Sequence, residues 1–400
     1  MNFSFDDAME AEIQRAAQRL LEGRLVAFPT ETVYGLGADA ENVQAIARIY
    51  AAKGRPANHP VIVHLAPGAS LQYWAAGVPP QAQKLIDTFW PGPLTLILPR
   101  AERIPAAVAG GQDSIGLRCP SHPIAQALLR RFAELKGGQG GVAAPSANQF
   151  GQVSPTLAEH VRAEFPGMPE DELLILEGGA SEVGIESTIL DLSRLEQGVG
   201  PVILRPGHIT AVQMGEVLGL APESLIPGEA GEGMHDSSRV EVAHQRGGGG
   251  LVQEPLSQAR AGSQRQEPRQ DQVQDRAHIQ APRVSGSLKA HYAPRTPLQV
   301  SSWDGIQKLA DAGLLPGQRL ACIVFERPEG KPSSVPGIDW FVVKAEPHAY
   351  ARELYALLRR LDQGGYARLV FEQPPRSAPW RAVNDRLGRA AAAFDASLPK

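Results

Sequence analysis

The sequence predicts an α/β protein of two domains that are separated by a long polar segment. Short apolar runs alternate with helical patterns from about residue 10 to 220, composition changes near residue 228, and a second alternation follows near residue 298. A chain of 400 residues also exceeds the usual size of one hydrophobic core. We therefore expect a larger domain at 10–222, a connecting segment at 223–297 and a smaller domain at 298–400.

The larger domain is expected to hold a twisted mixed sheet with helices around a concave site, because strands and helices alternate along it. An amphipathic helix pattern opens the domain, with apolar residues at helical spacing from Ile13 to Leu21. Later helices are expected at 42–52, 80–89, 122–135 and 156–163. The expected strands lie in the runs at 26–28, 61–65, 94–98, 114–118, 141–145, 173–178, 187–192 and 202–207.

The connecting segment has an unusual composition. Residues 228–282 include four glycines at 247–250, are rich in Gly, Gln, Arg and Ser, and contain almost no aromatic residues. Such a segment cannot bury enough apolar surface to offset the entropy lost on ordering. We predict that it is a disordered linker, and that order returns at VSGSLKAHYAP, residues 284–294.

The smaller domain shows its own α/β pattern. Strands are expected at 319–325, 339–345 and 367–375, with a helix at 348–365 and a helical tail from 382. This pattern predicts a small Rossmann-like domain with a parallel sheet.

Composition excludes several classes of protein. The formal net charge of -4, with 39 basic and 43 acidic residues, gives no general case for binding nucleic acid or membranes. Cys119 and Cys322 are the only cysteines, which excludes a disulfide framework and CxxC zinc sites. No secretion signal is recognisable, and no apolar run approaches the roughly 18 residues that cross a bilayer. We expect a soluble cytoplasmic protein.

Polar motifs follow several of the expected strands. FPTETVYGLG at 28–37 leaves a strand with many hydrogen-bonding groups, and an extended backbone would place Thr30 and Thr32 on one face and Glu31 on the other. In KGRPANHPVIVH at 53–64, two cations in a stiff loop could hold a polyphosphate or could simply cap a helix. His64 at the strand end could equally be structural.

Two further segments carry similar chemistry. Arg118 ends a strand where α/β folds bind ligands, although a surface ion pair explains it as well. In 141–156, hydroxyls and an amide alternate with small residues, and SPT is interpreted as a helix N-cap with a proline at N1. The sequence contains no GxxxxGK[ST] loop and no GxSxG nucleophile motif, so any nucleotide is held in another way.

Seven motifs in this order resemble the YrdC-type threonylcarbamoyl-AMP synthase family. They are PTETVYGLGADA, KGRPANHPVIVHL, FWPGPLTLIL, GLRCPSHP, APSAN with SPT, GIESTILDL and LRPG. HYAP and the C-terminal α/β region resemble the long, two-domain form of the family. The resemblance covers about 10–220 and 284–400.

The resemblance implies a nucleotidyltransferase that joins L-threonine, bicarbonate or CO2, and ATP into threonylcarbamoyl-AMP and releases pyrophosphate. The product would feed N6-threonylcarbamoyladenosine formation on tRNA by downstream partner proteins, and a weak contact with tRNA itself is also compatible with the resemblance. Mg2+ would accompany the ATP phosphates, without a cage of protein carboxylates. The rival interpretations are a carbamoyl-adenylate-forming maturation factor, which would add cysteine-rich zinc modules, and an RNA-binding module.

The resemblance also assigns roles to residues. Thr32, His64, Arg118 and Ser187 would bind threonine, with Arg118 on its carboxylate. His59 stands where relatives often have Asn, and Tyr292 would reach back from the linker's end, in a segment 284–294 that closes the cavity as a lid. The implied ATP-binding residues are Lys53, Arg55, His59, Ser114, Ser146, Asn148, Ser154, Arg205 and Tyr292.

Overall fold

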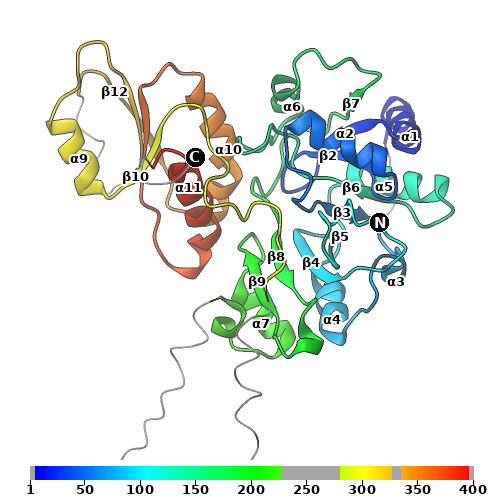
Figure 1. Cartoon of the computed structure of the whole chain (residues 1–400). Helices are drawn as coiled ribbons and strands as arrows, with labels where there is room; N and C mark the ends of the chain where they lie inside the picture. The colour runs from blue at the N-terminus through cyan, green and yellow to red at the C-terminus, as the bar shows by residue number, and fades with distance from the viewer. Residues whose placement is uncertain (1–4, 228–279, 327–334, 396–400) are drawn as a thin grey trace, which may run out of the picture. The chain divides into compact units, whose positions relative to one another are not determined.

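The structure, a computed structural model, describes residues 5–227, 280–326 and 335–395 (Figure 1). The described residues of 5–227, 282–326 and 335–395 belong to one compact unit. The predicted disordered linker at 228–282 lies almost wholly outside the described residues and stays a prediction.

The N-terminal part contains one nine-stranded sheet with the order β7-β1-β2-β6-β3-β5-β4-β8-β9. The pairs β7–β1, β3–β5 and β4–β8 are parallel and the others are antiparallel, so the predicted mixed sheet is confirmed. The strands are β1 (Leu25–Phe28), β2 (Gly35–Asp39), β3 (Ile62–Leu65), β4 (Leu94–Pro99), β5 (Ser114–Arg118), β6 (Gly141–Ala143), β7 (Leu173–Ile175), β8 (Thr188–Asp191) and β9 (Val202–Arg205).

Both faces of this sheet are buried. In β1, Val26 and Phe28 contribute to one apolar cluster and Leu25 and Ala27 to another, as alternation along a strand requires. On the first face α1 and α5 lie side by side (Figure 1). The helices of this part are α1 (Asp7–Leu21), α2 (Val43–Lys53), α3 (Leu71–Trp74), α4 (Pro80–Phe89), α5 (Pro123–Leu135), α6 (Ala158–Glu164) and α7 (Ala211–Leu218), with short 3-10 turns η1 (Leu195–Gln197) and η2 (Pro222–Leu225).

One strand was not predicted from the sequence, and one local prediction was wrong. The GLGAD segment forms β2, although its two glycines make it look unlike a strand. A Cβ on Gly37 would lie 2.8 Å from both Phe28 and Val142, so the close packing of the sheet requires glycine at this position. The SPT segment does not cap α6, whose N-cap is Leu157 and has no side-chain cap hydrogen bond. The hydroxyl of Ser154 is engaged elsewhere, as described below.

The C-terminal part contains a four-stranded sheet with the order β10-β13-β11-β12, in which every pair is parallel. This confirms the predicted small parallel sheet. Its elements are β10 (Leu298–Ser301), α9 (Trp303–Asp311), β11 (Leu320–Phe325), β12 (Ile338–Val343), α10 (Pro347–Asp362), β13 (Arg368–Glu372), η4 (Ala378–Trp380) and α11 (Arg381–Ala392).

The segment 284–294 returns to the N-terminal part. Arg205 donates from Nη1 to the carbonyl of Ser285 at 3.0 Å, and the amide of Ala293 donates to the carbonyl of Gly151 at 2.9 Å. The segment thus crosses the ends of several strands of the large sheet. None of the helices within the described ranges is long and apolar enough to cross a membrane.

Candidate functional site

A small polar cavity lies where β1, β5, β6 and β9 end and β8 begins, beneath the segment 284–294. Its volume is about 30 Å³. Ligand pockets usually measure roughly 300–1,000 Å³, so this cavity leaves room only for molecules of about the size of water. Its lining residues are Thr30, Thr32, Val33, Gly35, Ile62, His64, Arg118, Ala144, Pro145, Ser146, Glu186, Ser187, Arg205, Ser285, His291 and Tyr292.

The two threonines come from a tight turn after β1 rather than from an extended strand. Thr30 Oγ1 donates to the carbonyl of Val33 at 2.6 Å and lies 2.8 Å from Thr32 Oγ1. Since the proton of Thr30 is used on that carbonyl, Thr32 is the donor to Thr30, and the lone pairs of the Thr32 hydroxyl remain to accept from a ligand. The turn therefore presents an acceptor at the cavity wall.

Glu31, between these threonines, points away from them and pairs with Arg118. Glu31 Oε1 lies 2.7 Å from Arg118 Nη2, and both side chains are buried. Glu31 Oε2 also accepts from the backbone amide of Ser121 at 3.2 Å. Arg118 is therefore held by a partner that was not predicted from the sequence. Its Nε also donates to the carbonyl of Gly92 at 3.4 Å, so the N–H groups of Nη1 are the ones left for an anion.

His64 is buried on β3, edge-on to the ring of Phe28 at 5.9 Å between centroids. Burial, followed by the charge of Arg118, lowers the pKa of His64 to about 3, so the imidazole is neutral near pH 7. Its Nδ1 has no hydrogen-bond partner among the described residues. Since buried polar atoms are nearly always paired, we expect a ligand or water to satisfy this nitrogen.

Lys53 and Arg55 lie just outside the cavity lining. Gly54 adopts a left-handed conformation (φ 59°) as the C-cap of α2, which turns the chain so that both cations are buried. Lys53 Nζ donates to the backbone carbonyl of Ser146 at 2.6 Å and to that of Asn148. Arg55 donates from Nη2 to the carbonyl of Pro60 at 2.8 Å, and its Nε has no partner in the described ranges.

These two cations are buried without a directly paired carboxylate in the part of the chain that the structure describes, although the charge of Glu164 acts on Lys53. Within the described residues, neither Lys53 nor Arg55 has a carboxylate within ion-pair distance. Burial, followed by the charge of Arg55, lowers the pKa of Lys53 well below its usual range, and burial lowers the pKa of Arg55 to about 10. Buried cations without a counter-charge are costly, so this edge of the site favours an anion.

Ser187 and Arg205 form a connected wall at the junction of β8 and β9. Arg205 donates to the carbonyl of Ser187 from Nε at 3.1 Å and from Nη2 at 2.9 Å, and Nη2 also reaches the Ser187 hydroxyl at 3.1 Å. That hydroxyl lies 2.8 Å from Thr95 Oγ1. Both residues are buried, so their orientation is set before any ligand binds.

Not every residue assigned from the sequence lines this cavity. Ser114 lines a neighbouring recess with Arg283 and Val284, and His59 stacks edge-on against Phe150 at 5.4 Å. Asn148 donates to the carbonyls of Gln149 and Gln152, while its Oδ1 has no partner among the residues described. The assigned residues in the lining are Thr32, His64, Arg118, Ser146, Ser187, Arg205 and Tyr292.

Glu186 is a residue of the site that was not predicted from the sequence. It lies in the cavity wall, accepts a 2.6 Å hydrogen bond from Ser154 Oγ, and pairs with Arg386 Nε at 2.8 Å. Burial opposes its charge, but Arg386 and Arg205 prevail and lower the pKa of Glu186 to about 2. The sequence offered one signal for it: in GIESTILDL, a glutamate stands directly before two hydroxyl residues and an apolar strand. A charged residue next to a buried strand needs a buried partner.

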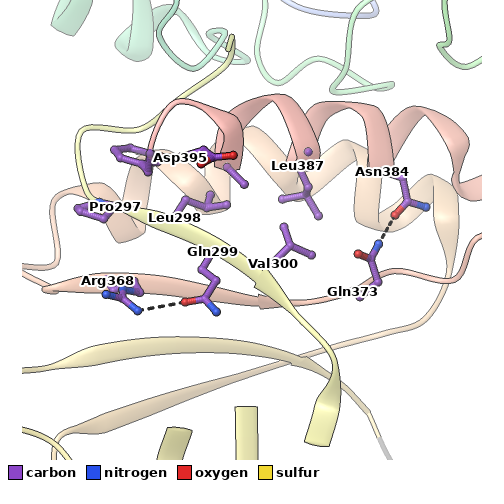
Figure 2. A pocket seen from close by; sticks show the side chains of 12 residues that line it. Pro297, Leu298, Gln299, Val300, Arg368, Gln373, Asn384, Leu387 and Asp395 are labelled. Atoms are coloured by element: carbon purple, nitrogen blue, oxygen red, sulfur yellow. Dashed lines mark hydrogen bonds between the residues drawn. The ribbon is translucent and has the colours of Figure 1, made fainter. Parts of the chain in front are cut away.

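A larger cavity of about 460 Å³ lies in the C-terminal part, between β10 and α11 (Figure 2). Four of its polar side chains form two pairs: Arg368 donates to Gln299 at 3.0 Å, and Gln373 to Asn384 at 2.6 Å. Apolar residues such as Leu387 supply much of the remaining lining. Because its chemistry is mutually satisfied, size alone does not make it the better candidate site.

Comparison with known proteins agrees with the motif pattern. A family model described as "Telomere recombination" matches residues 18–207, and one described as "Threonylcarbamoyl-AMP synthase, C-terminal domain" matches residues 253–392. The threonylcarbamoyl-AMP synthase of Bacillus subtilis is 33% identical over 385 residues, covering 96% of this chain and 93% of that protein. The chain belongs to the YrdC-type threonylcarbamoyl-AMP synthase family.

Other members of this enzyme family support the long, two-domain form. The threonylcarbamoyl-AMP synthase of Pyrococcus abyssi is 45% identical over 210 residues, a match that covers 52% of this chain and 58% of that protein. A crystal structure titled as P. abyssi Sua5 complexed with L-threonine has a TM-score of 0.71 and 31% identity, covering 96% of this chain and 95% of that one. The chain is thus an enzyme of this family by sequence and by fold.

Proposed function

We propose that this enzyme condenses L-threonine, bicarbonate or CO2, and ATP into threonylcarbamoyl-AMP and releases pyrophosphate. The observation that carries the proposal is the convergence of Thr32, His64, Arg118 and Ser187 on one cavity beside two buried cations. A hydroxyl acceptor, a neutral imidazole and an arginine fork suit a small zwitterion. Two buried cations suit a polyphosphate.

The reaction needs two bond-forming steps. The threonine amine, after losing a proton to solvent, bonds to the carbon of CO2 or bicarbonate and gives a carbamate. With CO2 the nitrogen releases a second proton to solvent, and with bicarbonate water leaves. A carbamate oxygen then attacks the α-phosphorus of ATP, and the bond from the α-phosphorus to the β-bridging oxygen breaks, so pyrophosphate leaves. Positioning and charge neutralisation suffice for these steps, and no protein nucleophile is required.

The geometry supports the following roles for the residues proposed to bind threonine. Thr32 would accept from the amino group, and the free N–H groups of Arg118 would bind the carboxylate, beside the Glu31 pair. His64 would orient the reacting groups by hydrogen bonding, because a group with a pKa of about 3 is too weak a base to collect a proton near pH 7. Ser187 would complete this wall.

The nucleotide side would use Lys53, Arg55 and Arg205 on the phosphates. Lys53 reaches the cavity loop through the carbonyls of Ser146 and Asn148, so phosphate binding and loop position would be coupled. The ribose and base would contact the remaining assigned residues, which are His59, Ser114, Ser146, Asn148, Ser154 and Tyr292.

Mg2+ is proposed to arrive with ATP. No group of three metal-ligating side chains occurs in the described ranges, and the one carboxylate in the cavity wall, Glu186, is engaged by Arg386. The donors left for the ion are phosphate oxygens and water, which Mg2+ prefers in nucleotide sites. The ion would neutralise phosphate charge there.

The segment 284–294 is proposed to act as a lid. A space of about 30 Å³ holds no more than a few waters, so both substrates require Ser285, His291 and Tyr292 to move outward. Closure afterwards would exclude water from a labile carbamate and mixed anhydride. A chain cut after residue 222 that kept full ATP-dependent activity would contradict this part.

The function is tested by incubating the full chain with ATP, labelled bicarbonate and L-threonine. The expected result is pyrophosphate release that requires all three, with label in an adenylate. Release without threonine, or release that requires carbamoyl phosphate instead, would overturn the proposal; the latter would favour a carbamoyl-adenylate-forming factor. The adenylate would then be offered to tRNA-modifying partner proteins as the downstream step.

A further inference from the structure

Glu186 joins the cavity wall to two helices of the C-terminal part. Its Oε2 accepts from Tyr355 of α10 at 2.9 Å and from Arg386 Nε of α11 at 2.8 Å. Its Oε1 accepts from Ser154. All of these groups are buried, and Arg386 is 1% exposed. The next residue along the chain is Ser187, which the proposed function places on threonine.

Arg386 also contacts the segment that covers the cavity. Its guanidinium lies 5.1 Å from the centre of the Tyr292 ring, a cation–π distance. Among the described residues, Tyr292 is the only non-glycine residue with a left-handed backbone (φ 61°). Its buried hydroxyl has no hydrogen-bond partner among those residues. A residue in this conformation persists only where its surroundings hold it.

A neighbouring residue of α11 holds the same segment. Arg389 Nη1 donates to the carbonyls of Ser287 at 2.9 Å and Leu288 at 2.6 Å, and its own carbonyl accepts from the amide of His291 at 3.2 Å. One face of α11 thus contacts both Glu186 in the cavity wall and the segment 284–294 that covers the cavity.

Charge makes this arrangement sensitive to Arg386. A buried carboxylate that loses its partner becomes an uncompensated charge and tends to take up a proton. The other cation that acts on Glu186 is Arg205, which is already engaged with Ser187 and Ser285. The charged and titratable groups around Glu186 are Arg386 and Asp385 of α11, Tyr355 of α10, Arg205 of β9, and His291 and Tyr292 of the covering segment.

We propose that Arg386 is a positioning residue for the active site: its ion pair with Glu186 and its contact with the Tyr292 ring hold both residues in place, so that the C-terminal domain completes the site built by the N-terminal domain. This inference rests on the proposed function. It assigns to α11 a role in threonine binding, although none of its residues lines the cavity.

The test compares Arg386→Leu, Arg386→Lys, Glu186→Gln and the double variant Arg386→Leu with Glu186→Gln in the full chain. The matched control is Arg319→Leu, because Arg319 pairs with Asp339 and lies 4.8 Å from the ring of Tyr366. This group is also an arginine with a carboxylate and a tyrosine, but at the exposed surface. Threonine-dependent pyrophosphate release is measured from pH 5 to 9, and amide hydrogen exchange is followed in 284–294.

In Arg386→Leu we expect kcat/KM for threonine to fall about tenfold or more, the scale of a lost charge-assisted hydrogen bond. The loss should deepen as pH falls, because Glu186 now takes up a proton, and Glu186→Gln should remove that pH dependence from the double variant. Arg386→Lys should recover part of the activity, and Arg319→Leu should behave as wild type. Amides in 284–294 should exchange faster only in the Arg386 variants.

A folded Arg386→Leu protein with the wild-type pH profile and wild-type exchange would overturn the proposal. If Arg386→Leu fails to fold, the variants Arg386→Lys and Glu186→Gln provide the test. A KM for threonine that is unchanged in both of them would refute the proposal. Absence of threonine-dependent release in the wild-type protein would instead refute the proposed function, and the exchange measurement would still test the positioning by α11.

Discussion

Arg118 allows the sharpest test of the site, because the structure separates two effects of removing it. Its partner Glu31 is 2.7 Å away, and the two side chains are 5% and 4% exposed. Arg118→Ala therefore removes a proposed ligand for the threonine carboxylate and also leaves a buried glutamate without its counter-charge. The double variant Arg118→Ala with Glu31→Gln also removes the side chain proposed to bind threonine, but it leaves no unpaired buried charge.

The expected magnitudes differ. A hydrogen bond to a charged group contributes roughly 1.5–3 kcal/mol, and since Arg118 already shares its charge with Glu31, we expect the lower end, about a tenfold loss of threonine affinity. Unpairing a buried ion pair costs about 3–5 kcal/mol of folding stability. The single variant should show both losses, and the double variant should recover stability while threonine binding stays weak.

Calorimetric titration with L-threonine and urea unfolding measure the two quantities. Arg162→Ala is the control, because Arg162 pairs with Glu177 at 3.0 Å while both are more than half exposed, where such pairs contribute about 0–1 kcal/mol. If the double variant bound threonine as tightly as wild type, Arg118 would serve only to neutralise Glu31. The carboxylate assignment would then be wrong.

Three further predictions concern binding and stability. Lys53→Met should raise the Kd for ATP and leave threonine affinity nearly unchanged, because a cation without a carboxylate partner in the described ranges is lost. Equilibrium dialysis with ATP and with threonine measures both dissociation constants, and a larger effect on threonine would contradict the assignment. Gly37→Ala should destabilise the fold by about 1–3 kcal/mol, since its Cβ would lie 2.8 Å from two side chains, whereas Gly388→Ala in α11 meets no atom within 4 Å and should be neutral or stabilising in the same thermal melts. His64 has a pKa of about 3 in the folded protein against 6.5 when free, so its contribution to folding stability is complete above pH 6.5 and is lost as pH falls toward 3. His64→Gln should therefore flatten the plot of unfolding free energy against pH between these values, as measured by urea unfolding. An unchanged slope of that plot would show that the imidazole is not buried in solution.

Much of the architecture could be predicted from the sequence because it depends on local patterns. Apolar runs such as 94–98 correspond to strands, and the helix predicted at 42–52 is α2, with Asn42 as its N-cap and Gly54 as its C-cap. Strand β2 could not be predicted, because GLGAD has low strand propensity and pairs only through close contacts with β1 and β6.

The sequence by itself determined which segments hold polar chemistry, since hydroxyls and cations at the ends of apolar runs mark one edge of the sheet. Only the tertiary structure decided how those groups are paired. Glu31 finds Arg118 across 87 positions, and Glu186 finds Arg386 across 200. The physical reason is burial: a charge removed from water must have a partner, and which partner it meets depends on long-range packing that no local pattern encodes.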